Sequence, residues 1–280
     1  MGQVEYVEVA GSEPAVLFFP GGHCTAAADC GWDLYTGGGH RLVSFSRPGY
    51  GRTTVGPLHA AEFVPAVAQC CTSLGITQIA AVVGVSFGGM QAIHAARALP
   101  IPVHGLVLHS CAPSSLPYPD TTAQTWGAPV AFGTWTQHWT WAAVALLIHS
   151  DSGLKRMLAP LSTQPVDDWW PTWSEQDKSR ARALFQAMNS GAGFTLDLRQ
   201  ARADRAEYRR AMQQQVACPT LITASRHDRG VAFHHAQDLA ATIPDATLRE
   251  LPARSHLFWL GPEAQQARDA VTTFLASIVS

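Results

Sequence analysis

Charged side chains are scarce in this sequence, and no cluster of one sign stands out. Aspartate, glutamate, lysine and arginine make up 14% of the 280 residues, against 47% hydrophobic residues, and the formal net charge is −2. A chain of this length and composition buries a core without metals or disulfides, and disorder is not expected. Because no basic patch offers an electrostatic footprint for nucleic acid, we expect no nucleic-acid partner.

Long apolar runs and export signals are also missing. The segment WAAVALLIHS at 141–150 is too short to cross a bilayer. The first residues, MGQVEYVEVA, do not place a basic segment before an apolar one, as a signal peptide would. We therefore expect no membrane span and a cytoplasmic location.

Paired cysteine motifs are absent as well. No C-x-x-C pair occurs among the six cysteines, which argues against a zinc site or a thioredoxin-like motif. Without an export signal we expect reduced thiols, although Cys24 and Cys30 could pair in an oxidising compartment. The group His227, Asp228, His234 and His235 fits no standard ligand spacing. We expect no metal and no cofactor, and the sequence leaves the oligomeric state open.

Short apolar runs alternate with helical patterns along most of the chain. This alternation predicts an α/β fold with a doubly wound, mainly parallel sheet of about seven to eight strands. The runs that predict strands lie at 15–19, 41–46, 79–85, 103–110, 219–224 and 246–251. Helical patterns occupy 60–75, 87–99, about 233–242 and the segment PEAQQARDAVTTFLASIV near the end of the chain.

Residues 113–215 differ from the rest of the chain. Prolines punctuate the start of this region, and Asp120 is the only charged residue between Cys111 and Ser150. Seven of the nine tryptophans lie here: Trp126, Trp135, Trp139, Trp141, Trp169, Trp170 and Trp173. We predict a helical cap at 113–215, inserted into a core formed by 1–112 and 216–280. Trp135 and Trp139 are possible pocket residues, although tryptophans of this kind also serve simply to join a cap to a core.

The segment Gly84-Val85-Ser86-Phe87-Gly88 matches the pattern G-x-S-x-G. It follows an apolar strand and opens a helix, which is the context in which this motif presents a nucleophilic serine. A serine on such a sharp turn has an unfavourable backbone, so the residues two positions away must lack side chains. A tight turn without catalytic function is the alternative for Ser86.

With this motif the chain resembles the α/β-hydrolase fold family, in its capped branch of esterases, C–C hydrolases and aminopeptidases. The segment LFFPGGH (17–23) is similar to the family's strand and oxyanion loop, although Pro20 stands where a histidine is usual. The resemblance implies that the backbone N–H groups of Gly22 and Phe87 form an oxyanion hole. SRPGYGRT (46–53) is similar to a glycine-rich turn of the family, for which we expect a structural role.

The family also requires an acid after a late strand and a histidine after the last strand. Asp228 follows the strand predicted at 219–224, and His256 lies in the loop after 246–251. The order Ser86, Asp228, His256 is the order that this fold uses. Ser225 and Ser255 replace glycines that commonly precede the acid and the histidine.

These residues predict a hydrolase with a Ser-His-Asp triad that acts on a small-molecule substrate, a mostly apolar ester, thioester or lactone. His23, beside the oxyanion loop, and His109, at a strand end, are further possible pocket residues. A C–C bond hydrolase, a lyase or a perhydrolase would keep the same residues. So would a receptor-like protein that senses a ligand, and these alternatives stay open.

Overall fold

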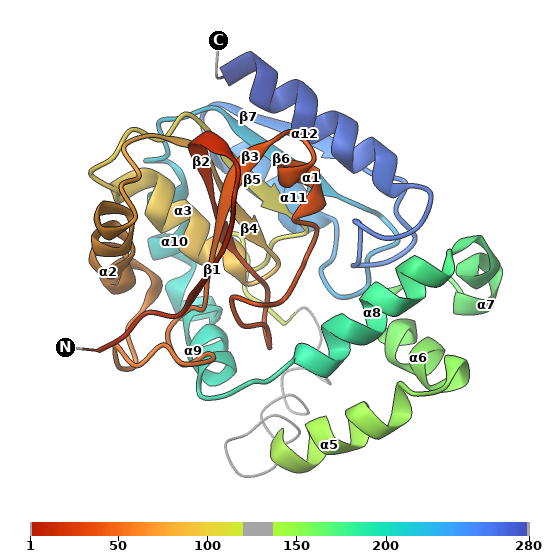
Figure 1. Ribbon diagram of the computed structural model, residues 1–280. Helices are drawn as coiled ribbons and strands as arrows, with labels where there is room; N and C mark the ends of the chain where they lie inside the picture. Colours follow the sequence, from red (N-terminus) through yellow and green to blue (C-terminus); the bar gives the residue numbers. More distant parts are fainter. Residues whose placement is uncertain (1, 120–136, 279–280) are drawn as a thin grey trace.

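A seven-stranded sheet forms the centre of the protein (Figure 1). The computed structural model describes residues 2–119 and 137–278. The strands are β1 (Tyr6–Val9), β2 (Ser12–Phe19), β3 (His40–Phe45), β4 (Ile79–Val85), β5 (Leu106–His109), β6 (Thr220–Ala224) and β7 (Ala246–Glu250). Their order across the sheet is β1-β3-β2-β4-β5-β6-β7, with all neighbours parallel except β1 and β3. The predicted α/β class and mainly parallel sheet are confirmed.

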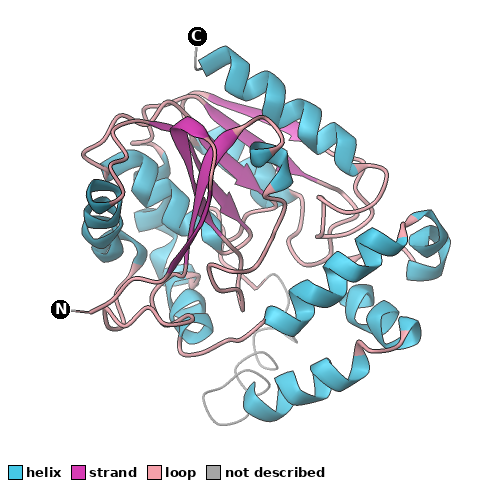
Figure 2. Cartoon of the chain, viewed as in Figure 1, coloured by secondary structure: helices cyan, strands magenta, loops and turns pink. Residues whose placement is uncertain are grey.

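Helices cover both faces of this sheet (Figure 2). Successive side chains along a strand point to opposite faces. Val16 and Phe18 of β2 share a buried cluster with α12 (Ala264–Ile278), whereas Leu17 and Phe19 share another. That second cluster includes residues of α2 (Ala60–Ser73), α3 (Gly88–Ala98) and α11 (His234–Thr242). Every residue of β4 is buried, as expected for a strand covered on both faces. A short helix α1 (Asp33–Thr36) contacts α12.

The strand β1 was not among the sequence-based expectations. It has four residues, YVEV, and pairs antiparallel with β3 at the edge of the sheet. Its residues alternate between exposed and half-buried, so it lacks the continuous apolar run that marks the central strands.

All described elements between β5 and β6 are helical. They are α5 (Gln137–Leu147), α6 (Asp151–Leu158), α7 (Val166–Trp169), α8 (Glu175–Ala187), α9 (Gly193–Gln200) and α10 (Ala206–Gln213), with short 3-10 turns at Ala159–Leu161, Trp170–Thr172 and Ala203–Arg205. We call residues 137–213 the helical insertion. Figure 1 shows α5 to α8 grouped together below the sheet, whereas α9 and α10 return along the side that carries α2 and α3.

The apolar interior of the helical insertion is continuous with the cluster between the sheet and α12. Trp169, Trp170 and Trp173 are between 2% and 7% exposed and belong to the same buried cluster as Ile148 and Leu154. These tryptophans therefore join helices to one another. Within the ranges that the structure describes, none of the helices is both long enough and apolar enough to pass through a membrane.

Candidate active site

Ser86 lies on the sharp turn between β4 and α3. Its φ of +53° is in the left-handed region, which residues other than glycine rarely adopt. Side chains on the flanking glycines would clash with the backbone. A Cβ on Gly84 would lie 2.6 Å from the Cα of Gly89, and one on Gly88 would lie 2.0 Å from the carbonyl oxygen of Phe19. The glycines of the motif are thus required sterically, and they allow a strained turn that presents the serine.

Asp228 and His256 lie in the loops that follow β6 and β7. The Nδ1 atom of His256 is 2.7 Å from Oδ2 of Asp228. The aspartate side chain is 1% exposed and the histidine side chain 13% exposed. Burial lowers the pKa of His256, but the charge of Asp228 and this hydrogen bond outweigh it, so the pKa is raised above its ordinary value. The backbone N–H of Val231 donates to the other carboxylate oxygen of Asp228.

Ser86 is placed at the same edge of the sheet but is not bonded to the histidine. Because β4, β6 and β7 are parallel, the loops after their carboxyl ends meet at one edge. Among the residues that the structure describes, the Ser86 hydroxyl forms no hydrogen bond, whereas His256 and Asp228 are joined. Without substrate, hydrogen bonds between a nucleophile and its base are often long, and they tighten in the complex.

Of the two serines that stand where the resembled family commonly has glycine, Ser225 connects the loops of Asp228 and His256, and Ser255 bonds within its own loop. Ser225 Oγ donates to the carbonyl oxygen of Ala253 and accepts from the N–H of His227. The Ser255 hydroxyl accepts from the N–H of Leu257. These substitutions add hydrogen bonds across and within the two loops.

The loop 20–23 lies against Ser86 and Phe87. A Cβ on Gly21 would be 3.2 Å from the Cβ of Ser86, and one on Gly22 would be 3.0 Å from the ring of Phe87. In the described part of the chain, the N–H groups of Gly22 and Phe87 donate to no other group. Two free donors beside a serine could stabilise an oxyanion.

Arg47 holds the loop 20–23 in place, a role that the sequence did not predict. Its guanidinium donates to the carbonyl oxygens of Pro20 (3.2 Å) and Gly21 (2.9 Å). It also forms a buried ion pair with Asp197 of α9, at 2.5 Å, and Tyr50 donates to the same carboxylate. The segment 46–53 therefore forms a turn and also fixes the loop 20–23 through Arg47. One feature of the sequence indicated this role of Arg47: it is an arginine directly after an apolar strand, with no carboxylate nearby in the chain to pair with it.

His23 connects the loop 20–23 to the helical insertion. Its Nδ1 is 2.7 Å from the Ser190 hydroxyl, which also accepts from the indole N–H of Trp141. Its ring lies 4.0 Å from that of Phe194 and 5.2 Å from that of Trp141. Burial, and then the charge of Arg47, lower the pKa of His23 to about 3. His23 is thus a neutral residue beside the loop, and its place in a substrate pocket stays a prediction.

His109, the other predicted pocket histidine, belongs to the core instead. It has no exposed surface, and its two ring nitrogens bond to the hydroxyls of Tyr35 (2.8 Å) and Thr223 (2.6 Å). Burial lowers its pKa to about 3. With both nitrogens used inside the fold, His109 is not available to a substrate.

The two tryptophans predicted to line a pocket are Trp135 and Trp139. Trp135 lies outside the described residues, as does Trp126. Trp139 is 76% exposed, so it does not form a buried ceiling as expected. Trp141, two residues further along α5, contacts His23 instead. Residues two apart on a helix point in directions about 200° apart, so the tryptophans occupy opposite sides.

A metal site is not found near these residues. In the ranges 2–119 and 137–278, no group of three or more histidine, cysteine or acidic side chains is placed to hold a metal ion. His227 lies near Gln164, and His235 bonds to Ser114. The chemistry available here is that of a hydroxyl, an imidazole, a carboxylate and backbone donors.

Comparison with known proteins decides the family. The model of the alpha/beta hydrolase fold family matches residues 14–262. The chain belongs to the alpha/beta hydrolase fold family. This hydrolase is 30% identical to the uncharacterized hydrolase YcgS of Bacillus subtilis, over 99% of this chain and 96% of that one. It is 27% identical to the pimeloyl-[acyl-carrier protein] methyl ester esterase of Xylella fastidiosa, over 98% and 99%.

Solved structures show the same fold. An alpha/beta hydrolase fold protein from Nakamurella multipartita has a TM-score of 0.77 at 22% identity, with 98% of this chain and 96% of that one covered. The enol-lactonase from Burkholderia xenovorans has a TM-score of 0.69 at 17% identity, over 98% and 97%. The family resemblance and the prediction of a hydrolase are confirmed.

Proposed function

We propose that this hydrolase cleaves a small, mostly apolar carboxylic ester, thioester or lactone by acyl transfer through Ser86. The observation that carries the proposal is the strained backbone of Ser86 at the carboxyl edge of the sheet that also presents the His256–Asp228 pair. Strain at a single residue is retained where function requires it. The Xylella fastidiosa relatives, named as methyl ester esterases, support an ester substrate.

In the proposed reaction, His256 accepts the proton of Ser86 while Oγ attacks the carbonyl carbon. Since Nδ1 of His256 faces Asp228, the Nε2 atom takes this proton. The N–H groups of Gly22 and Phe87 stabilise the oxyanion, and one such donor is typically worth about 3 kcal/mol in the barrier. His256 then protonates the leaving alcohol or thiol, and a water molecule hydrolyses the acyl-enzyme.

Apolar side chains near the proposed oxyanion donors support the substrate class. The rings of Phe194 and Tyr118 pack edge-on against Phe87 at 5.9 Å and 5.1 Å. His23, on the same side, is neutral because its pKa is lowered to about 3. These surroundings favour an uncharged acyl or alcohol group.

The test compares wild type, Ser86→Ala and Ser110→Ala on 4-nitrophenyl esters of increasing chain length. Ser110 directly follows the neighbouring strand β5 and also has a positive φ of 46°, so it is a matched control for backbone strain. We expect Ser86→Ala to lower kcat/KM by at least about 1,000-fold, and Ser110→Ala to retain most of the activity. A fluorophosphonate should label wild type on the peptide that contains Ser86.

Three results would contradict the proposal. The first is ester turnover that survives Ser86→Ala. The second is fluorophosphonate labelling with negligible ester turnover, which would favour a ligand-sensing protein. If vinylogous diketones were cleaved faster than every ester, C–C bond hydrolysis would replace ester hydrolysis as the function.

A further inference from the structure

A short segment of the helical insertion contacts both loops that carry the predicted acid and histidine. It comprises residues 161–164, between α6 and α7, and we call it the connecting segment. Within it, Ser162 forms an antiparallel bridge with Asp228 itself. Two backbone hydrogen bonds flank this bridge, from Thr163 N–H to the His227 carbonyl oxygen (2.9 Å) and from Arg229 N–H to the Leu161 carbonyl oxygen (3.3 Å). The insertion thus holds the main chain on both sides of the acid.

The connecting segment also holds the loop of the histidine. The Leu161 carbonyl oxygen accepts a second hydrogen bond, from the N–H of His256 itself (2.9 Å). The Ser162 hydroxyl donates to the carbonyl oxygen of Arg254 (2.6 Å), two residues before the histidine. One stretch of the insertion therefore bonds to the main chain around both His256 and Asp228.

Ser162 is the buried centre of these contacts. It is 2% exposed, and its hydroxyl also accepts from the N–H of Gln164 (3.0 Å), which helps to orient the bond that it donates. Where hydrogen bonds flank a pair of facing residues in this way, their Cα atoms approach to about 4.5 Å and their side chains lie close. Ser162 therefore packs beside the acid while its hydroxyl bonds to the histidine's loop.

Gln164 adds an outer link between the same two loops. Its side-chain nitrogen lies 3.3 Å from Nε2 of His227, and its side-chain oxygen accepts from the guanidinium of Arg254 (3.2 Å). His227 directly precedes Asp228, and Arg254 lies close before His256. The connecting segment thus joins the loops through side chains as well as through the main chain.

The distance between these two loops matters for the proposed reaction. The ring of His256 has to bond to Asp228 through Nδ1 and accept the proton of Ser86 through Nε2. A displacement of about 1 Å in a reacting group can cost roughly 100-fold in rate. Contacts that fix the main chain of both loops therefore affect the rate without touching the substrate.

We propose that Ser162 is a positioning residue for the His256–Asp228 pair. Its bridge to Asp228 and its hydrogen bond to Arg254 keep the two loops at the separation at which the imidazole meets the carboxylate. The inference rests on the proposed function, because it gives Ser162 a role in the same hydrolytic centre. Since that role is exerted through His256, loss of the Ser162 hydroxyl should change kcat more than KM.

The first test compares wild type with Ser162→Ala. We expect kcat for 4-nitrophenyl esters to fall by about tenfold or more, with KM little changed. We also expect the pKa of His256, measured by NMR, to fall, because the charge of Asp228 and their hydrogen bond raise it in wild type. The His256 signal is identified by its loss in His256→Gln.

The pKa of His256 reports geometry in this test, because Ser162→Ala removes no charge. The titratable and charged side chains next to His256 along the two loops all remain in the variant: Arg226, His227, Asp228, Arg229 and Arg254. A lower pKa would therefore mean that the imidazole has moved away from the carboxylate. The acidic limb of kcat/KM should shift to lower pH by the same amount, since catalysis needs the neutral ring.

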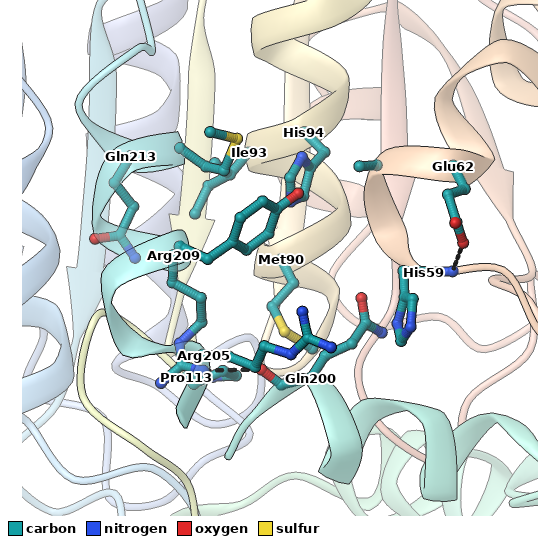
Figure 3. Close-up of a pocket in the computed structure, with 13 residues that line it drawn as sticks. His59, Glu62, Met90, Ile93, His94, Pro113, Gln200, Arg205, Arg209 and Gln213 are labelled. Carbon is teal, nitrogen blue, oxygen red and sulfur yellow. Dashed lines mark hydrogen bonds between the residues drawn. The ribbon is translucent and has the colours of Figure 1, made fainter. Parts of the chain in front are cut away.

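The matched control is Ser114→Ala. Like Ser162, Ser114 is buried, and its hydroxyl accepts from the N–H two residues ahead and pairs with a distant group, here Nδ1 of His235 in α11 (2.9 Å). The preceding Pro113 lines a pocket between α3 and α10, and none of the three predicted catalytic residues lines that pocket (Figure 3). We expect Ser114→Ala to lose stability in urea as Ser162→Ala does, but to keep kcat and the pKa of His256.

Two further variants separate positioning from folding. Ser162→Thr keeps the hydroxyl and should restore both kcat and the pKa of His256. Gln164→Ala changes a half-buried residue and removes the outer link, so it should fold and lower kcat by about threefold. It carries the test where Ser162→Ala does not fold.

Three outcomes would overturn the proposal. One is equal kcat and equal His256 pKa in Ser162→Ala and Ser114→Ala. Another is a lower kcat in Ser162→Ala with an unchanged pKa of His256. The third is unchanged kcat and pKa in Gln164→Ala where Ser162→Ala does not fold. Failure of the proposed function is a separate result, since it appears as ester turnover in Ser86→Ala, and the pKa of His256 then still decides whether Ser162 positions the pair.

Discussion

The loops at the carboxyl edge of the sheet and the helical insertion contribute to the candidate active site in different ways. The loops carry Ser86, His256 and Asp228. In the proposed reaction Ser86 attacks the substrate, His256 transfers the proton and Asp228 orients His256. The insertion carries Asp197 and Ser190, which hold Arg47 and His23 in place. The three loop residues follow buried strands whose register is set by the sheet. The positions of Asp197 and Ser190 depend instead on how the helices pack. The lesson is that chemistry and positioning come from different parts of the chain.

The largest effect should come from the loops. Asp228→Asn removes the charge that raises the pKa of His256 and changes the tautomer that its ring prefers. We expect kcat to fall by about 10⁴-fold. Because catalysis needs a neutral His256, the remaining activity should extend to lower pH than in wild type. The pH profile of kcat/KM measures this shift, and an unchanged acidic limb would contradict the assigned pair.

The second effect concerns the ion pair that joins the two regions. Asp197→Asn leaves the buried Arg47 charge without its counter-ion, which should cost about 3–5 kcal/mol in the free energy of unfolding. Because Arg47 also holds the carbonyls of Pro20 and Gly21, kcat should fall by roughly tenfold or more. Urea unfolding and ester kinetics measure the two effects.

The control for this variant is Asp204→Asn. Asp204 forms an exposed pair with Arg202, so its loss should cost less than about 1 kcal/mol. Equal losses in Asp197→Asn and Asp204→Asn would show that the buried pair has no special role. A stability loss in Asp197→Asn without any change in kcat would show that the ion pair does not position the loop 20–23 for catalysis.

A smaller effect is expected at the contact between His23 and the insertion. Ser190→Ala removes the hydroxyl that His23 Nδ1 and Trp141 Nε1 share in two half-buried hydrogen bonds, which should cost about 0.5–1.5 kcal/mol. Ser73→Ala, which removes an exposed hydroxyl of α2, should change stability by less than about 0.5 kcal/mol. If both variants unfold at the same urea concentration, the proposed link at His23 is unimportant.

The smallest effect should be found at Trp139. Since this side chain is 76% exposed, Trp139→Ala should change stability by no more than about 0.5 kcal/mol and leave KM unchanged. Trp141→Phe removes less surface but loses the hydrogen bond to Ser190, and it should cost about 1 kcal/mol. A rise in KM in Trp139→Ala alone would restore Trp139 as a pocket residue.

Much of the core could be predicted from the sequence because its signals are local. Runs such as IAAVVGV and the glycines around Ser86 specify a buried strand and a strained turn within ten residues. The edge strand β1 was missed because four half-exposed residues carry no such signal. The His256–Asp228 contact was expected from the resemblance to the α/β-hydrolase family, which has its acid and histidine in these loops, and these two side chains do meet.

The orientation of the tryptophans in the insertion could not be predicted from the sequence. Trp139 and Trp141 lie in one apolar segment, and only the packing of α5 decides that Trp141 faces His23 and Trp139 faces solvent. His109 was equally compatible with a pocket and with the core. Its two hydroxyl partners, Tyr35 and Thr223, lie far from it in the sequence.

The sequence by itself determined the fold, the strained turn at Ser86 and the loops in which Asp228 and His256 lie. Steric demands of a turn and the periodicity of buried strands involve neighbouring residues, so they can be recognised in the chain. Only the tertiary structure decided that Arg47 pairs with Asp197, 150 residues away, and that residues of α3 and α10 line one pocket. Those features depend on how distant helices pack, which no local pattern specifies.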